Sequence, residues 1–297
     1  MTTKTVAFVG LGVMGEAMCR NVATKANGRW SVIGVDTRPE PLVRLKADGV
    51  TAAASLADAV AKADVILLCL PGGKEVEAVA RGAGGLMGLV RTGQTVVDMS
   101  TAPPKLMREL DAQFAEKGVA FADAPVARTR RAAVDGTLSI MVGARRELFE
   151  MLKPILDTMG TEVTLCGAVG AGQVVKLMNN MVVFETTMAI AEAISIAEAA
   201  GVDGKLLYET MAKGSADSFV LRNHGMKHLV PQDYPTEAFS VRYGQKDLAY
   251  ARELAKQHGV VARGADLVAE MFEEAVERGD GDRYTPVIRR GMAKTGK

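Results

Sequence analysis

Six residues near the N-terminus limit the possible folds of this chain more than any other segment: Gly10, Leu11, Gly12, Val13, Met14 and Gly15. They follow an apolar run at Thr5–Val9 and open a helical pattern at Gly15–Thr24. In such a segment the first glycine makes a tight turn and the second lets a pyrophosphate approach the backbone. The third glycine allows close helix–strand packing, and the first helix amides face the phosphates. The segment therefore predicts a dinucleotide site formed by all six residues.

The acidic residue after the next predicted strand bears on the choice of dinucleotide. Asp36 follows Ser31–Val35, close to the spacing of about 20 residues expected for a ribose-binding acid. A carboxylate there accepts hydrogen bonds from the ribose and repels a 2′-phosphate, which favours NAD(H). Arg38 could pair with a phosphate, so NADP(H) is the alternative. The sequence contains no GxxxxGK[ST] pattern, which excludes a P-loop phosphotransferase.

Short apolar runs alternate with helical patterns over the first 165 residues. The predicted strands are Thr5–Val9, Ser31–Val35, Val65–Cys69, Thr95–Asp98, Ala120–Asp123, Leu138–Val142 and Thr161–Leu165. Helices are predicted between them at Gly15–Thr24, Pro39–Asp48, Ser55–Ala61, Pro104–Lys117 and Arg145–Met159. The glycine-rich stretch 72–85 is interpreted as a flexible loop with a short helix. This alternation predicts an α/β Rossmann domain with a doubly wound, parallel sheet.

The pattern changes after the glycines at 167–172, where little strand signal remains. Helices are predicted at Gln173–Ala200, Lys205–Lys213, Gln245–His258, Gly264–Arg278 and Val287–Ala293. We therefore predict a dinucleotide-binding domain at 1–167 and an all-α substrate and oligomerisation domain at 168–297, joined by the long helix. Because that helix is apolar nearly all round, a homodimer or homotetramer is expected.

Composition narrows the class of protein. The 36 basic and 35 acidic residues leave a net charge of +1, which argues against nucleic-acid binding as the main function. The three cysteines form no CxxC pair, and the N-terminus has no signal-peptide pattern. No apolar run is long enough for a membrane span. We expect a reduced, cytoplasmic protein that binds no membrane.

Histidine is available only late in the sequence, at His224, His228 and His258. An acid/base group elsewhere must therefore be Lys, Glu, Asp, Tyr or Cys. Lys176 and Asn180 are one turn apart in an apolar stretch of the long helix, and lysine is rarely buried without a partner. Lys176 is thus a candidate proton-transfer group. The structural alternative is a lysine that extends its ammonium to solvent.

No metal site is predicted. His224 and His228 are one helical turn apart, but no Cys or acidic partner lies at ligand spacing. We interpret both as surface or interface residues.

Five segments occur in order over nearly the whole chain: FVGLGVMGEAMCRN, VVDMST (96–101), DAPVARTRRAAVDGTLSIMVG (123–143), GAGQVVKLMNNMVV (170–183) and GQKDLAYA (244–251). Together they resemble the β-hydroxyacid dehydrogenase family, which includes 3-hydroxyisobutyrate dehydrogenase, tartronate semialdehyde reductase and, more distantly, 6-phosphogluconate dehydrogenase. The resemblance implies hydride transfer between a nicotinamide cofactor and a small anionic 3-hydroxyacid or its semialdehyde.

The resemblance also implies roles for individual residues. Lys176 would be the catalytic acid/base, and Asn180 would orient the substrate beside Asn179. Asp247 would support Lys246 at the substrate. The cofactor would be lined by Leu70, Pro71 and Thr101 and closed in by Phe239 and Lys246.

The chain departs from the family after DAPV, where most relatives have Ser-Gly-Gly. Here the residues are Ala127, Arg128 and Thr129, so a guanidinium replaces backbone amides that would hold an anion. The Arg128-Thr129 pair is similar to the residues at this position in the sulfolactaldehyde reductase branch. This resemblance implies that Arg128 and Thr129 bind a hydroxysulfonate substrate. A carboxylate substrate of the 3-hydroxyisobutyrate or tartronate semialdehyde kind is the alternative. The structural alternative is that Arg128 binds no substrate and belongs to a solvated run of charged residues.

Two further functions are compatible with a Rossmann domain. A dinucleotide-binding sensor would bind NADH without turnover, but it would have no need of Lys176 and Lys246. An imine reductase uses the same scaffold, and that group generally lacks the catalytic lysine.

Overall fold

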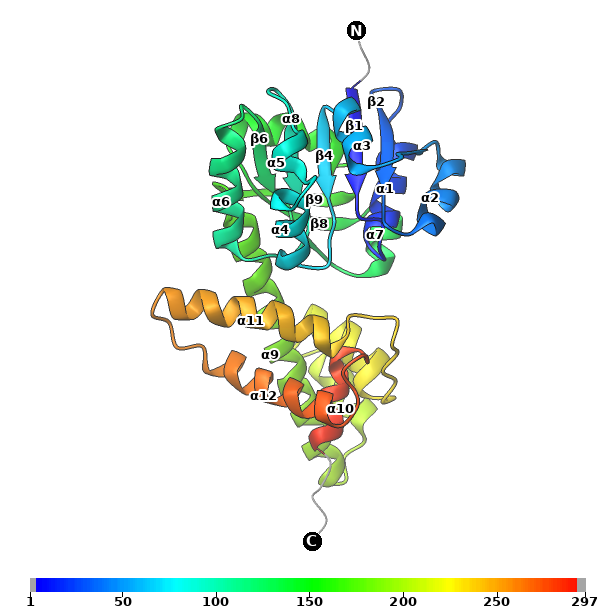
Figure 1. Cartoon of the computed structure of the whole chain (residues 1–297). Helices are drawn as coiled ribbons and strands as arrows, with labels where there is room; N and C mark the ends of the chain where they lie inside the picture. The colour runs from blue at the N-terminus through cyan, green and yellow to red at the C-terminus, as the bar shows by residue number, and fades with distance from the viewer. Residues whose placement is uncertain (1–3, 293–297) are drawn as a thin grey trace. The chain divides into compact units, whose positions relative to one another are not determined.

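The computed structural model describes residues 4–292, which form two compact units that meet in the sequence at Lys176 and Leu177. The N-terminal unit contains the sheet with its helices, and the C-terminal unit is helical (Figure 1). This architecture confirms the predicted fold class, a Rossmann-type α/β domain followed by a helical domain.

The sheet of the N-terminal unit has the strand order β3-β2-β1-β4-β5-β6-β8-β7, with β9 paired to β8. Its strands are β1 (Lys4–Val9), β2 (Trp30–Val35), β3 (Thr51–Ala52), β4 (Val65–Leu68), β5 (Thr95–Asp98), β6 (Ala120–Asp123), β7 (Val126–Ala127), β8 (Leu138–Gly143) and β9 (Gly160–Gly167). The pairs from β3 through β6 are parallel, as is β8–β9. The prediction of a parallel sheet is wrong for β6–β8 and β7–β8, which are antiparallel. The β7–β8 connection, 128–137, is too short for a parallel crossover, which needs a dozen or more residues.

Helices cover both faces of this sheet, because successive side chains of a strand point to opposite sides. Val6 and Phe8 of β1 pack into one core, whereas Ala7 and Val9 pack into the other. The first core includes side chains of α1 (Gly15–Thr24), α2 (Pro39–Leu45), α7 (Arg130–Asp135) and α8 (Arg146–Leu156). The second includes side chains of α3 (Leu56–Lys62), α4 (Gly73–Arg81), α5 (Leu86–Leu89) and α6 (Pro104–Ala115).

The single tryptophan of the chain belongs to the first of these cores. Trp30 is 8% exposed at the start of β2, and its indole Nε1 donates to the carbonyl of Val22 on α1 at 3.0 Å. The Arg29 guanidinium lies 4.5 Å from the centre of the ring. The indole is therefore fixed between a strand and a helix of the N-terminal unit.

The C-terminal unit begins within the longest helix. Its elements are α9 (Ala171–Ala199), α10 (Gly204–Met211), a π-helix (Leu221–Leu229), α11 (Val241–Gln257), α12 (Arg263–Glu277) and a 3₁₀ segment (Thr285–Met292). One core joins Phe184 of α9 to α11 and α12 through Leu248 and Phe272. A second joins Ile190 of α9 to α10 and the π-helix through Tyr208 and Leu221. The later part of α9 therefore organises both cores of this unit.

Most predicted elements agree with the structure to within a few residues. The strands β3 and β7, the helices α5 and α7 and the π-helix were not predicted. The stretch 72–85 contains the predicted helix, α4, which spans most of it, and α5 begins just after the stretch at Leu86. A strand of two residues is too short to show an alternating pattern. The last predicted helix is 3₁₀ over its described length, and its final residue, Ala293, lies outside the described residues.

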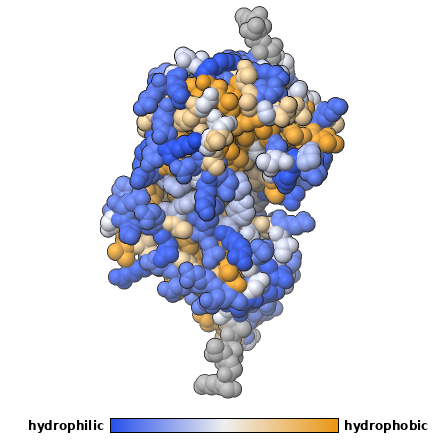
Figure 2. Space-filling model, in the orientation of Figure 1, coloured by the Kyte–Doolittle hydropathy of each residue, from blue (hydrophilic) through white to orange (hydrophobic). Residues whose placement is uncertain are grey.

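By length and composition alone α9 could cross a membrane, whereas the sequence predicted no membrane span. Core helices of soluble proteins share this length and composition, so these two properties do not by themselves show a span. Most of its apolar stretch is not buried within the chain, and Val182 and Ile196 are more than half exposed. In the view of Figure 2, hydrophilic residues cover much of the surface, and hydrophobic ones gather mainly over the N-terminal unit.

Candidate active site

The glycine segment forms the turn from β1 to α1. Gly10 has a φ of +91° and donates its N–H to the Val35 carbonyl of β2 at 2.9 Å. A Cβ on Gly10 would lie 2.3 Å from the Cys69 carbonyl oxygen, whereas a Cβ on Gly12 would have no atom within 4 Å. The turn thus requires Gly10 for its own backbone, and it leaves open space at Gly12. That space fits the close approach of a pyrophosphate.

Asp36 follows β2 and is held by the glycine turn. Its carboxylate accepts the N–H of Leu11 at 2.6 Å and the backbone and side-chain N–H groups of Arg38 at 2.8 and 3.2 Å. Burial alone would raise the pKa of Asp36, but the bonds from Arg38 and Leu11 outweigh it and lower the pKa below its ordinary value. Asp36 is therefore an ionised acceptor, and the Arg38 charge is paired with it.

The other predicted cofactor residues of this unit lie in loops after neighbouring strands. Leu70 and Pro71 follow β4, and Thr101 follows β5. The Leu70 N–H donates to the Ser100 hydroxyl at 2.9 Å, which ties the two loops together. Because β1, β4 and β5 are adjacent and parallel, these loops share the carboxyl edge of the sheet with the glycine turn. Ligands of doubly wound sheets bind at this edge.

Two carboxyl groups that the sequence reading did not single out are buried at the same edge. Asp98 ends β5 and Asp123 ends β6; they are register partners, and both are 0% exposed. Burial raises the pKa of Asp123 to about 7, the Asp98 charge adds to that rise, and N–H donors from Gly170 and Gln173 oppose it. Both residues stood inside the motifs VVDMST and DAPV, so a buried strand that ends in Asp was the available signal.

Lys176 and Asn180 both lie on α9 and are 8% and 7% exposed. The Asn180 amide donates to Asp247 Oδ2 at 2.7 Å, and the exposed Asn179 donates to Asn180 Oδ1 at 3.1 Å. Lys246 Nζ lies 3.0 Å from the other oxygen of Asp247. The structure therefore gathers Asn179, Asn180 and Lys246 around the buried carboxylate of Asp247, so that four predicted residues of the C-terminal unit form one cluster.

Aromatic rings surround the ammonium of Lys246. The rings of Tyr243 and Tyr250 lie on α11 one turn before and after it, each with its centre 5.6 Å from Nζ. Phe239, which is 37% exposed, stacks on Phe184 of α9 with ring centres 6.0 Å apart. The cationic head of Lys246 is thus held by one carboxylate and two rings, in reach of cation–π attraction.

Arg128 has an unusual backbone for an arginine. Its φ is +84°, in the left-handed region where glycine is favoured. Its Nη1 donates to the Thr137 carbonyl at 2.6 Å and to the Thr161 hydroxyl at 3.1 Å. Thr129 is the N-cap of α7, and its hydroxyl accepts the Ala132 N–H at 3.4 Å. Arg128 is exposed, and these bonds occupy only one nitrogen of its guanidinium among the described residues.

One of the two helical histidines is placed differently from the prediction. His224 is not a surface residue: it is 8% exposed, and its ring bonds the hydroxyls of Thr187 at 3.2 Å and Tyr284 at 2.8 Å. Burial lowers its pKa to about 4, so the ring is neutral near pH 7. His228 is more exposed and contacts the Asp233 carbonyl at 2.9 Å. Within residues 4–292, no three His, Cys, Asp or Glu side chains cluster as metal ligands would.

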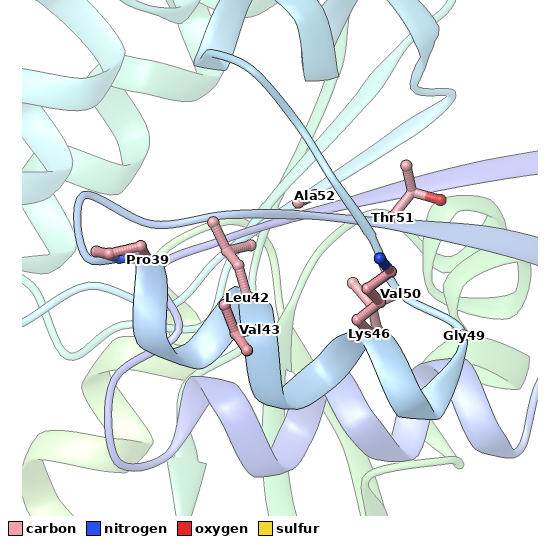
Figure 3. Close-up of a pocket in the computed structure, with 8 residues that line it drawn as sticks. All are labelled: Pro39, Leu42, Val43, Lys46, Gly49, Val50, Thr51 and Ala52. Atoms are coloured by element: carbon pink, nitrogen blue, oxygen red, sulfur yellow. The ribbon is translucent and has the colours of Figure 1, made fainter.

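A pocket in the N-terminal unit is formed by α2 and the segment that follows it. Its lining is drawn in Figure 3: Pro39, Leu42, Val43, Lys46, Gly49, Val50, Thr51 and Ala52. None of the predicted site residues lines it. We therefore assign it no part in the reaction.

A glycine turn, a ribose-type acid and loops at one sheet edge define a dinucleotide-binding protein of the Rossmann type. Residues 5–167 match the NAD binding domain of 6-phosphogluconate dehydrogenase, and residues 170–289 match the NAD-binding domain of NADP-dependent 3-hydroxyisobutyrate dehydrogenase. The chain therefore belongs to the 3-hydroxyisobutyrate dehydrogenase-like family of NAD(P)-dependent dehydrogenases and reductases. The predicted family and enzyme class are confirmed.

Individual relatives cover nearly the whole chain. NAD-dependent L-serine dehydrogenase of Pseudomonas aeruginosa is 31% identical over 97% of both chains. 2-Hydroxy-3-oxopropionate reductase of Escherichia coli is 32% identical over 92% of both. The structure of Mycobacterium tuberculosis 3-hydroxyisobutyrate dehydrogenase with L-serine superposes with a TM-score of 0.88 at 28% identity, covering 99% of this chain and all of that one.

Proposed function

We propose that this enzyme interconverts a small anionic 3-hydroxyacid, or hydroxysulfonate, and its aldehyde, with Lys176 as general acid/base. The observation that carries the proposal is the burial of Lys176 on α9, one turn from the buried Asn180. The names of the relatives support it. Serine and 3-hydroxyisobutyrate carry a hydroxyl group, and 2-hydroxy-3-oxopropionate an aldehyde group, at the carbon β to a carboxylate. We also propose a cytoplasmic homodimer or homotetramer, supported by three free cysteines and the exposed apolar side chains of α9.

In the proposed mechanism the residues of this chain bind the dinucleotide, orient the substrate and transfer the proton. The glycine turn and Asp36 would hold the dinucleotide, which supplies or accepts the hydride when bound. The Lys176 ammonium would donate its proton to the aldehyde oxygen, and the neutral amine would take the proton from the alcohol in the reverse direction. Asn180, fixed by Asp247, would orient the oxygen beside Lys176. Lys246 would attract the anionic group.

We propose NAD(H) as the preferred dinucleotide, with NADP(H) as the alternative. Asp36 has a lowered pKa and is therefore negative near pH 7, where it would repel a 2′-phosphate. The Arg38 guanidinium is already engaged, because its Nε bonds the Asp36 carboxylate and its Nη2 donates to the Leu11 carbonyl at 3.3 Å.

A reductase screen tests activity, cofactor and substrate class together. Purified enzyme is assayed at NADH or NADPH with sulfolactaldehyde, methylmalonate semialdehyde, tartronate semialdehyde or succinate semialdehyde. We expect the highest kcat/KM with NADH and a three-carbon anionic aldehyde. Exclusive use of NADPH would refute the role given to Asp36. NADH binding without turnover of any substrate would instead indicate a sensor.

Arg128 decides between the sulfonate and carboxylate alternatives, and its backbone supplies a control. Arg128→Ala and Arg128→Gly both remove the guanidinium, and we expect KM for a sulfonate aldehyde to rise about 10- to 100-fold in each. Arg128→Gly alone also removes the cost of the left-handed backbone, so it should be more stable than Arg128→Ala by about 1 kcal/mol. Steady-state kinetics and thermal unfolding measure both effects. Wild-type KM in the two variants would place Arg128 in the solvated charge run.

A further inference from the structure

A chain of buried hydrogen bonds connects the first turn of α9 to the loops at the carboxyl edge of the sheet. Asp123 accepts the Gly170 N–H at 2.6 Å with Oδ1 and the Gln173 N–H at 2.8 Å with Oδ2. Both amides belong to the start of α9, where backbone N–H groups have no partner within the helix. The end of β6 therefore caps α9 with a fully buried carboxyl group.

The side chain of Gln173 makes a second connection. Its Oε1 accepts the Ala102 N–H at 3.0 Å, and its Nε2 donates to the Ser100 carbonyl at 2.7 Å. These two bonds flank Thr101, the residue expected to line the cofactor. Ser100 in turn accepts the Leu70 N–H through its hydroxyl. One glutamine thus ties α9 directly to the loop after β5, and the Ser100 hydroxyl links that loop to the loop after β4.

The space around Asp123 permits little adjustment. A Cβ on Gly143 would lie 2.1 Å from Oδ1, and a Cβ on Gly172 would lie 2.8 Å from Oδ2. Asp123 and Gln173 are both 0% exposed, so neither can exchange its partners for water. The tight packing and the buried hydrogen bonds restrict Asp123 and Gln173 to one geometry. Such a restricted pair is suited to hold the start of α9 in place against the sheet.

We infer that Asp123 and Gln173 are positioning residues that fix Lys176 relative to the cofactor loop at Thr101. Lys176 lies three residues after Gln173 on α9, so the two share a helix face. A hydride donor and a proton donor must reach one carbonyl group together, and a misplacement of about 1 Å can cost about 100-fold in rate. The inference rests on the proposed role of Lys176. Asp123 and Gln173 themselves need not touch the substrate.

Two near-isosteric variants of the whole enzyme test this role. Asp123→Asn keeps the shape but replaces one acceptor oxygen with a donor, and Gln173→Met removes both side-chain hydrogen bonds. In each we expect kcat to fall about 10- to 100-fold, with the dinucleotide Kd within about 2-fold of wild type. Because the two act through one network, the double variant should be little worse than the poorer single one. Independent effects would multiply instead.

A matched cap elsewhere is the control. Asp203 caps α10 by accepting the Leu206 N–H at 2.8 Å, so Asp203→Asn perturbs a helix start without touching this network. It should leave kcat unchanged. Amide hydrogen exchange gives a readout independent of turnover: the first turn of α9 should exchange faster in Asp123→Asn and Gln173→Met than in Asp203→Asn.

The outcomes separate this inference from the proposed function. The positioning role is overturned if Lys176→Ala is inactive while the folded Asp123→Asn and Gln173→Met enzymes keep the wild-type kcat. If Lys176→Ala is fully active, the proposed function fails, and faster exchange in α9 would then show a structural cap only, which also overturns the inference. Slow turnover at unchanged dinucleotide Kd, with faster exchange in α9, is the result that supports it. If a variant fails to fold, the other single variant decides.

Discussion

Lys176→Ala is expected to lower kcat by about 10²- to 10⁴-fold while the dinucleotide Kd stays unchanged. This is the range over which a positioned proton donor accelerates a reaction. The described first unit has no histidine that could replace it, since histidine enters the sequence only at His224. Stopped-flow or steady-state reduction at saturating NADH measures the loss, and titration of NADH fluorescence measures binding.

Arginine at the same position separates proton transfer from charge. Lys176→Arg keeps a cation but cannot release a proton near neutral pH, so its kcat should fall almost as far as in the alanine variant. Lys153→Ala is the control, because that ammonium pairs with Asp157 on an exposed surface and should not affect turnover. Substantial activity in Lys176→Arg would show that Lys176 binds an anion and that another group moves the proton.

Gly12→Ala is expected to weaken dinucleotide binding by about 100-fold, or about 2.7 kcal/mol, without destabilising the fold. The new methyl group meets no protein atom within 4 Å, so it can interfere only with a ligand that approaches the backbone. Isothermal titration with NADH and thermal unfolding measure the two quantities on the same sample. Normal NADH affinity in this variant would place the pyrophosphate elsewhere.

Gly10→Ala is the matched comparison. A methyl group there would approach the Cys69 carbonyl to 2.3 Å, and the φ of +91° strains any L-residue. We therefore expect this variant to lose stability as well as binding. Comparing the two variants would therefore separate the glycine required by the backbone conformation of the turn from the glycine required for dinucleotide binding.

The features that could be predicted from the sequence are those that depend on residues close together along the chain. The glycine turn, α1 and the strands of Val, Ile and Leu follow from local pattern, and α1 begins and ends at the predicted residues. The antiparallel pairing of β7 was missed because two residues carry no period. The π-helix was missed because its hydrogen-bond spacing differs from that of an α-helix.

The candidate site shows the same division. Lys176 and Asn180 were found because a helical period places them on one face. Asp123 was missed because its partners, Gly170 and Gln173, are about 50 residues away, and only the fold brings them to the end of β6. His224 was misplaced for a similar reason, because Tyr284, which bonds it, lies 60 residues further along the chain.

The position of Trp30 gives this chain a built-in optical label. Its indole is packed between β2 and α1, and the sequence has no second tryptophan, so tryptophan emission reports on the N-terminal unit alone. Far-ultraviolet circular dichroism, in contrast, reports on the helices of both units. Denaturation followed by the two signals therefore reveals whether the units unfold in one transition or in two.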